Sequence, residues 1–65
     1  MTKKDFEFIA DKIRVHVETA HERKDAEAVH TLHNLADDLA GWLKIKNPKF
    51  SRNKFMRACG LNPSY

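Results

Sequence analysis

The sequence predicts an all-α protein, built as an antiparallel helical hairpin with a short third helix folded across its open end. Apolar residues recur at spacings of three and four in two long segments, which is typical of amphipathic helices. Helix-capping residues bracket a third, shorter segment near the C-terminus. Sixty-five residues with only two glycines and two prolines fit one compact domain, residues 1–65.

The first helix is expected at about residues 3–21. Thr2 can cap its start, and Asp5 three residues later imitates the acidic half of a capping box. The apolar stripe that should face the core consists of Phe6, Ile9, Ala10, Ile13, Val17 and Ala20. Phe8 and Val15 lie nearly opposite this stripe, so they must be exposed, covered by the third helix or covered by another chain. We favour a surface for self-association or for a partner.

The second helix is expected at about residues 25–43, with Asp25 as its N-cap. Its apolar arc, which includes Leu35 and Trp42, spans roughly 160°, whereas one neighbouring helix needs only about 100°. The extra width indicates a second contact besides the first helix. Proline disfavours helical geometry in the residue before it, so the Asn47-Pro48 pair must end this helix by Asn47.

The third helix is expected at about residues 52–59, followed by a tail at 61–65. Ser51 is its predicted N-cap, and Phe50 can pack on Phe55 as a hydrophobic staple. Gly60 supplies the left-handed position of a Schellman motif, in which Leu61 contacts the last turn of the helix. Three aromatic residues are expected to join this helix to the hairpin: Trp42, Phe50 and Phe55.

Charge is divided unevenly along the chain. Residues 1–38 contain six Lys and Arg against nine Asp and Glu, whereas residues 39–65 contain six Lys and Arg and no acidic residue. This asymmetry indicates an electrostatic seam, either between protomers or toward a partner. Lys44, Lys46, Arg52 and Lys54 are expected to steer an acidic partner. The alternative is a small nucleic-acid-binding protein that uses the same basic third of the chain. A helix-turn-helix, however, needs a shorter turn than the one expected here.

The sequence contains no strong motif for catalysis or for binding a cofactor or a metal ion. The sequence has no glycine-rich phosphate loop, paired-carboxylate motif or Ser/His/Asp order, so we expect neither catalysis nor a cofactor. His30, His33 and Asp37 share one helix face, but no fourth ligand is fixed by their spacing, which makes them weak metal candidates. Cys59 lacks a neighbouring base and is expected to be a buried structural thiol.

Cellular location follows from the same composition. A single cysteine cannot form an intramolecular disulfide, which favours a reducing cytoplasm. The apolar runs fall short of the roughly 20 residues that a membrane span needs. Seven charged residues within positions 3–14 argue against a secretory signal.

Both ends of the chain resemble a known group of sequences. Met1-Thr2-Lys3-Lys4-Asp5-Phe6 with Ile9-Ala10 resembles the opening of many small uncharacterised phage and prophage proteins. Asn47-Pro48-Lys49-Phe50, then Arg52, Lys54-Phe55 and Ala58-Cys59-Gly60, resembles their ending. The resemblance implies an accessory protein that binds and disables a host bacterial protein, such as a transcriptional regulator, a quorum-sensing activator or a defence complex. It transfers no binding residues.

The sequence therefore favours a non-catalytic, homodimeric protein that binds a host protein in the bacterial cytoplasm. The contact surface is expected to comprise Phe8, Val15, Leu35 and Trp42.

Overall fold

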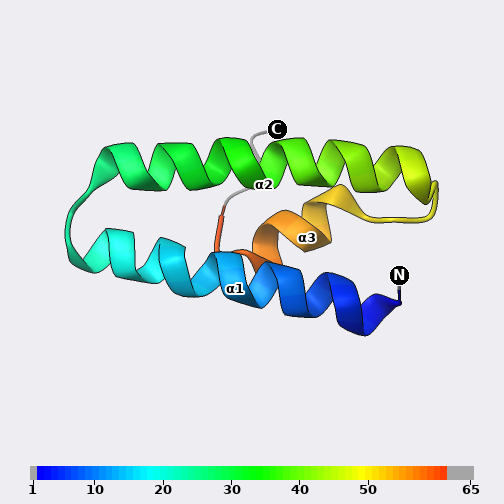
Figure 1. Ribbon diagram of the computed structural model, residues 1–65, viewed down its shortest axis with the longest axis horizontal. Coiled ribbons are helices and arrows are strands. Elements are labelled where there is room, and N and C mark those ends of the chain that lie inside the picture. Colours follow the sequence, from blue (N-terminus) through cyan, green and yellow to red (C-terminus); the bar gives the residue numbers. More distant parts are fainter. Residues whose placement is uncertain (1, 62–65) are drawn as a thin grey trace.

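The computed structural model describes residues 2–61, which contain three helices: α1 (Lys3–Glu22), α2 (Ala26–Lys46) and α3 (Arg52–Ala58). The predicted all-α class is confirmed, because the described residues contain no strand. α1 and α2 lie side by side and run in opposite directions, and the short α3 packs against both of them (Figure 1). Most of the expected tail, residues 62–65, lies outside the described part of the chain.

α1 begins with the capping box that its first residues predict. The hydroxyl of Thr2 accepts a hydrogen bond from the Asp5 N–H at 3.4 Å, and the Asp5 carboxylate accepts one from the Thr2 N–H at 2.8 Å. The second bond lowers the pKa of Asp5, because the backbone N–H stabilises the charged form. At the start of α2, the Asp25 carboxylate accepts a single N-cap hydrogen bond from the Ala28 N–H at 3.0 Å.

α2 continues to Lys46, three residues beyond the expected end at Leu43. Its C-cap Asn47 is extended, with φ −137°, as a residue before proline should be. Lys44 donates from Nζ to the backbone carbonyls of Pro48 at 2.6 Å and of Phe50 at 3.1 Å. These two hydrogen bonds hold the loop that brings the chain back toward α3.

α3 has a defined residue at each end. The Ser51 hydroxyl accepts from the Lys54 N–H at 3.3 Å. After the C-cap Cys59, Gly60 adopts a positive φ of 77°, and the Leu61 N–H donates to the Met56 carbonyl at 3.0 Å. This is the hydrogen bond of a Schellman motif, so α3 ends as its glycine predicts.

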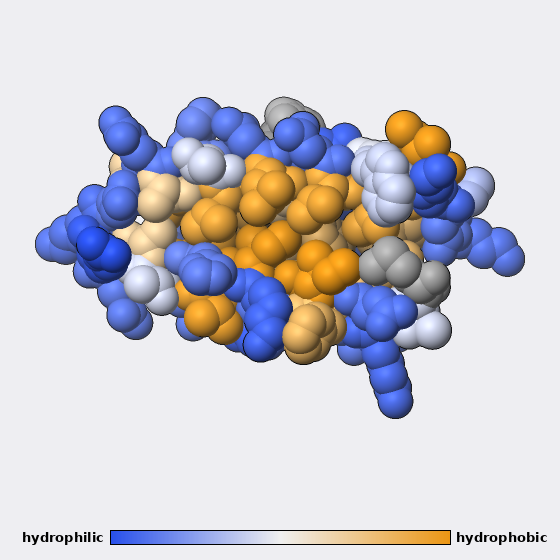
Figure 2. All heavy atoms as spheres, viewed as in Figure 1, coloured by the Kyte–Doolittle hydropathy of each residue, from blue (hydrophilic) through white to orange (hydrophobic). Residues whose placement is uncertain are grey.

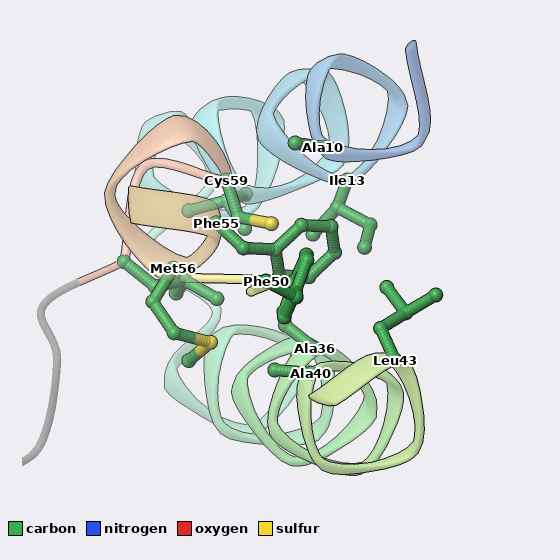
Figure 3. Close-up of a cluster of buried hydrophobic side chains, with 11 residues drawn as sticks. Ala10, Ile13, Ala36, Ala40, Leu43, Phe50, Phe55, Met56 and Cys59 are labelled. Carbon is green, nitrogen blue, oxygen red and sulfur yellow. The ribbon is translucent and has the colours of Figure 1, made fainter. Parts of the chain in front are cut away.

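The core is centred on Phe50, which lies between the three helices (Figure 3). The Phe50 ring meets the Phe6 ring edge-on at 5.1 Å between centroids and the Phe55 ring at 5.5 Å. The prediction that Trp42 also joins α3 to the other helices is wrong, because its side chain is 53% exposed. On α2 the fully buried residues Ala36 and Ala40 contribute to this core instead.

The three helices form two thin layers, with Cα extents of 35 × 23 × 14 Å. α1 and α2 make one layer, and α3 packs against one broad face of it (Figures 1 and 3). Within the described part of the chain, no helix covers the other broad face.

Candidate protein-binding surfaces

The ion pair between α3 and α2 shows which side of α2 is covered. Arg52 of α3 pairs with Asp37 of α2. Leu35 is two residues from Asp37 and therefore lies roughly 160° around the helix from it. Leu35 thus points to the side of the α1–α2 layer that α3 leaves uncovered.

An apolar stripe follows this side of α2. Leu32, Leu35, Leu39 and Trp42 are spaced by three, four and three residues, so they share one helix face. Leu32 and Leu39 pack against the core and are partly buried, whereas Leu35 is 48% exposed and Trp42 53% exposed. We call this stripe, together with the partly buried Ile9 of α1, the open face.

The open face is visible as an apolar patch at the centre of the broad side of the molecule, rimmed by hydrophilic residues (Figure 2). Two hollows flank it along the seam between α1 and α2. One, of about 410 Å³, is lined by Phe6, Trp42, Leu43, Lys46 and Asn47. The other, of about 360 Å³, lies near the α1–α2 connection and is lined by His16, Thr19, Ala20, Arg23, Asp25, Ala28, Thr31 and Leu32. Neither hollow includes a residue of α3.

Phe8 and Val15 form a separate apolar pair on the outer side of α1. Their side chains are 62% and 51% exposed. They lie about 160° around α1 from the buried stripe, so they point away from the core. Lys12 between them places its ammonium 5.0 Å from the centre of the Phe8 ring, a cation–π contact that leaves the outer edge of the ring accessible.

Ile45 is an exposed apolar residue that the sequence pattern does not single out. It is 79% exposed and lies in the last turn of α2. The expected end at Leu43 places Ile45 in a loop, where it has no helix face. Pro48 constrains only the residue before it, Asn47, so α2 is free to include Ile45. The position of this proline is therefore a sequence signal that the helix can extend beyond Leu43.

The four basic residues expected to steer a partner have different surroundings. Lys44 is held by two loop carbonyls, and Arg52 pairs with Asp37. Lys46 lies 5.6 Å from the Trp42 ring centre, at the end of the open face. Lys54 lines a groove on the α3 side. Lys44 and Arg52 therefore stabilise the fold.

The weak metal candidates do not come together as a site. No group of three or more His, Cys, Asp or Glu side chains among residues 2–61 could hold a metal ion. One of the three candidates, Asp37, pairs with Arg52, while His30 is exposed on α2 and His33 is partly buried.

Cys59 is fully buried in the core, and its side chain points inward from α3 (Figure 3). Burial raises the pKa of the Cys59 thiol to about 11, since the thiolate would lose its hydration. At neutral pH the sulfur is protonated and poorly nucleophilic. Cys59 is therefore a packing residue.

Comparisons with protein-family models, with curated proteins and with solved structures find no match for this chain. Among the described residues, none of the helices combines the length and the apolar character that crossing a membrane requires.

Proposed function

We propose that the protein is a non-catalytic accessory protein of the phage type, which binds a host bacterial protein through exposed apolar helical residues and alters its activity. The observation that carries this proposal is that five large apolar side chains among residues 2–61 remain about half or more exposed: Phe8, Val15, Leu35, Trp42 and Ile45. Exposed apolar clusters with polar rims are typical of protein-binding surfaces.

The two apolar surfaces suit two different contacts. The open face is continuous with the core through the partly buried Leu32 and Leu39, and it lies on the broad side of a molecule that measures 35 × 23 Å across that side. We assign it to a second copy of this chain, since packing two α1–α2 layers together would give a four-helix centre. Phe8 and Val15 point away from that contact and remain accessible to a host protein.

The class of host protein comes from the resemblance of the two chain ends to small phage proteins. It comprises transcriptional regulators, quorum-sensing activators and defence complexes, all in the bacterial cytoplasm. Phe and Val side chains at such a contact would supply the apolar anchors, while surrounding charges would orient the partner.

Affinity capture with matched variants tests this proposal. The wild-type protein, a Phe8→Ser/Val15→Ser variant and a His30→Ser/Asn34→Ser control are immobilised and exposed to bacterial lysate. His30 and Asn34 are exposed on α2, so the control also removes two surface side chains. We expect a host protein that is retained by the wild type and the control, lost with the Phe8/Val15 variant, and bound again when purified. Equal retention by all three proteins would contradict the proposed contact.

Nucleic-acid binding is the second candidate, favoured by the six basic and no acidic residues in positions 39–65. Two of these cations, Lys44 and Arg52, already have partners within the chain. Phe50 and Phe55 are buried and cannot stack on bases.

Lys49 and Lys54 are exposed basic residues that form no ion pair within residues 2–61, so their charge can be reversed without breaking one. If duplex DNA bound tightly, with an affinity that fell log-linearly with salt and was lost in a folded Lys49→Glu/Lys54→Glu variant, this second function would replace the first.

A further inference from the structure

A groove lies on the α3 side of the molecule, and it shares Phe6 and Asn47 with the hollow at one end of the open face. It lies between the first turns of α1 and α3 and has a volume of about 460 Å³. Three phenylalanines and three lysines contribute to its lining: Phe6, Phe50, Phe55, Lys3, Lys49 and Lys54. We call it the basic groove.

The aromatic part of the basic groove is held rigidly. Phe50 and Phe55 are almost completely buried, and Phe50 packs against both other rings. Phe6 is partly buried and packs on the same core. Because these rings are already fixed by the core, an apolar side chain entering the groove would meet a preformed surface with little ordering cost.

The rim of the groove carries uncompensated positive charge. Lys3, Lys49 and Lys54 are exposed, and within residues 2–61 none of them forms an ion pair. Glu7 is the one acidic residue in the described lining. Two of the chain's arginines differ in this respect, since Arg14 pairs with Asp11 and Glu18, and Arg52 pairs with Asp37. The three groove lysines are thus available to an external anion.

From this combination we infer that the basic groove binds an acidic peptide segment, one that inserts an apolar side chain against the phenylalanines and places Asp or Glu carboxylates near the three lysines. Charge complementarity selects the acidic segment, and the apolar lining selects its anchor residue. Base stacking needs an open ring face, which Phe50 and Phe55 do not offer at 6% and 4% exposure. The small surface that these rings present to the groove is enough for contact with one side chain, so a peptide fits better than a nucleic acid. This inference goes beyond the proposed function and uses a different face of the molecule.

Selection from a random dodecapeptide display library tests the inference even though the natural partner is unidentified. The full chain is the bait, and enriched peptides are then measured against two variants of equal net charge. Lys49→Gln/Lys54→Gln removes two groove cations, whereas Lys24→Gln/Arg57→Gln removes two exposed cations that do not line the groove. Circular dichroism verifies that both variants are folded.

We expect the enriched peptides to combine Asp or Glu with an aromatic or aliphatic anchor. Their affinity should fall about fivefold to tenfold with Lys49→Gln/Lys54→Gln, as for the loss of two exposed ion pairs, and should change little with the control. A failure to enrich any peptide, enrichment of neutral or basic peptides, or equal loss in both variants would overturn the inference. So would a single-stranded DNA oligonucleotide that binds with the same lysine dependence while no acidic peptide does. None of these results bears on the Phe8 and Val15 contact, so the two proposals fail separately.

Discussion

At the scale of single residues, burial decides the chemistry of Cys59. The neighbouring Gly60 and Met56 belong to the turn that ends α3, and this turn holds the thiol inside the core. A thiol in this position cannot ionise without exposing a charge to apolar surroundings. Its function is to fill space where α3 approaches the longer helices.

The raised pKa of Cys59 predicts a loss of stability at alkaline pH. Unfolding returns the thiol from a pKa of about 11 to its ordinary 9.0, so the stabilisation is complete below pH 9.0 and is lost as the pH rises toward 11. We expect the free energy of unfolding to fall by roughly 2–3 kcal/mol over this interval from this group alone. Urea denaturation at a series of pH values measures it.

The Cys59→Ala variant is the control for this pH dependence. It lacks the thiol but keeps every lysine, so lysine titration contributes equally to both proteins. The wild-type protein should therefore lose more stability than Cys59→Ala between pH 9.0 and 11. If the free energy of unfolding had the same pH dependence in both proteins, the thiol would ionise as readily in the folded state as in the unfolded one.

At the scale of elements, the two glycines of the chain have opposite roles. Gly60 ends α3 with φ 77°, and a Cβ there would lie 3.3 Å from Cγ of Arg14. Gly41 lies inside α2, and a Cβ there would meet no atom within 4 Å. We expect Gly60→Ala to lower the free energy of unfolding by about 1–2 kcal/mol and Gly41→Ala to raise it by about 0.5–1 kcal/mol.

Chemical denaturation followed by circular dichroism measures both changes, and each variant serves as the control for the other. Since the substitution is the same, any general effect of adding a methyl group cancels. A stabilising Gly60→Ala would mean that the left-handed turn does not fix the end of α3. A destabilising Gly41→Ala would mean that another backbone approaches α2 at this position.

The sequence predicts these elements well where local chemistry decides, and less well where packing between elements decides. The capping box of Thr2 and Asp5, the Ser51 cap and the Gly60 turn are local and could be predicted. The position of Trp42 could not, because its apolar arc on α2 has two flanks and periodicity does not say which one α3 covers. The basic groove could not be predicted from the sequence either, because its lining combines residues from both ends of the chain.

At the scale of the whole molecule, the open face has a consequence for its state in solution. A thin body whose α1–α2 layer is covered by α3 on one side leaves Leu35 and Trp42 in water. In a two-fold symmetric dimer each residue is buried twice, once in each copy. Each apolar side chain that is exposed in one chain would therefore contribute twice to the free energy of association.

The proposed two-fold dimer predicts that the Leu35→Lys variant is a monomer. Leu35 is 48% exposed in one chain, so association can bury only about half of each side chain. Losing this burial in both copies costs about 1.5–3 kcal/mol, which weakens association roughly 10-fold to 150-fold. Sedimentation equilibrium of the wild type and the variant measures this change. Asn34→Lys is the matched control, because it adds the same charge one residue away on an exposed part of α2 that points off the open face, and it should remain a dimer.

Trp42 gives a second measure of the same association, since it is the only tryptophan in the chain. Its fluorescence should shift to shorter wavelength as the wild-type concentration rises, because a second copy removes its exposed indole from water. The shift should be absent in Leu35→Lys and present in Asn34→Lys. A wild-type protein that sediments as a monomer, with an emission maximum that does not change with concentration, would show that no second copy covers the open face. The apolar stripe of α2 would then be accessible to the host protein itself.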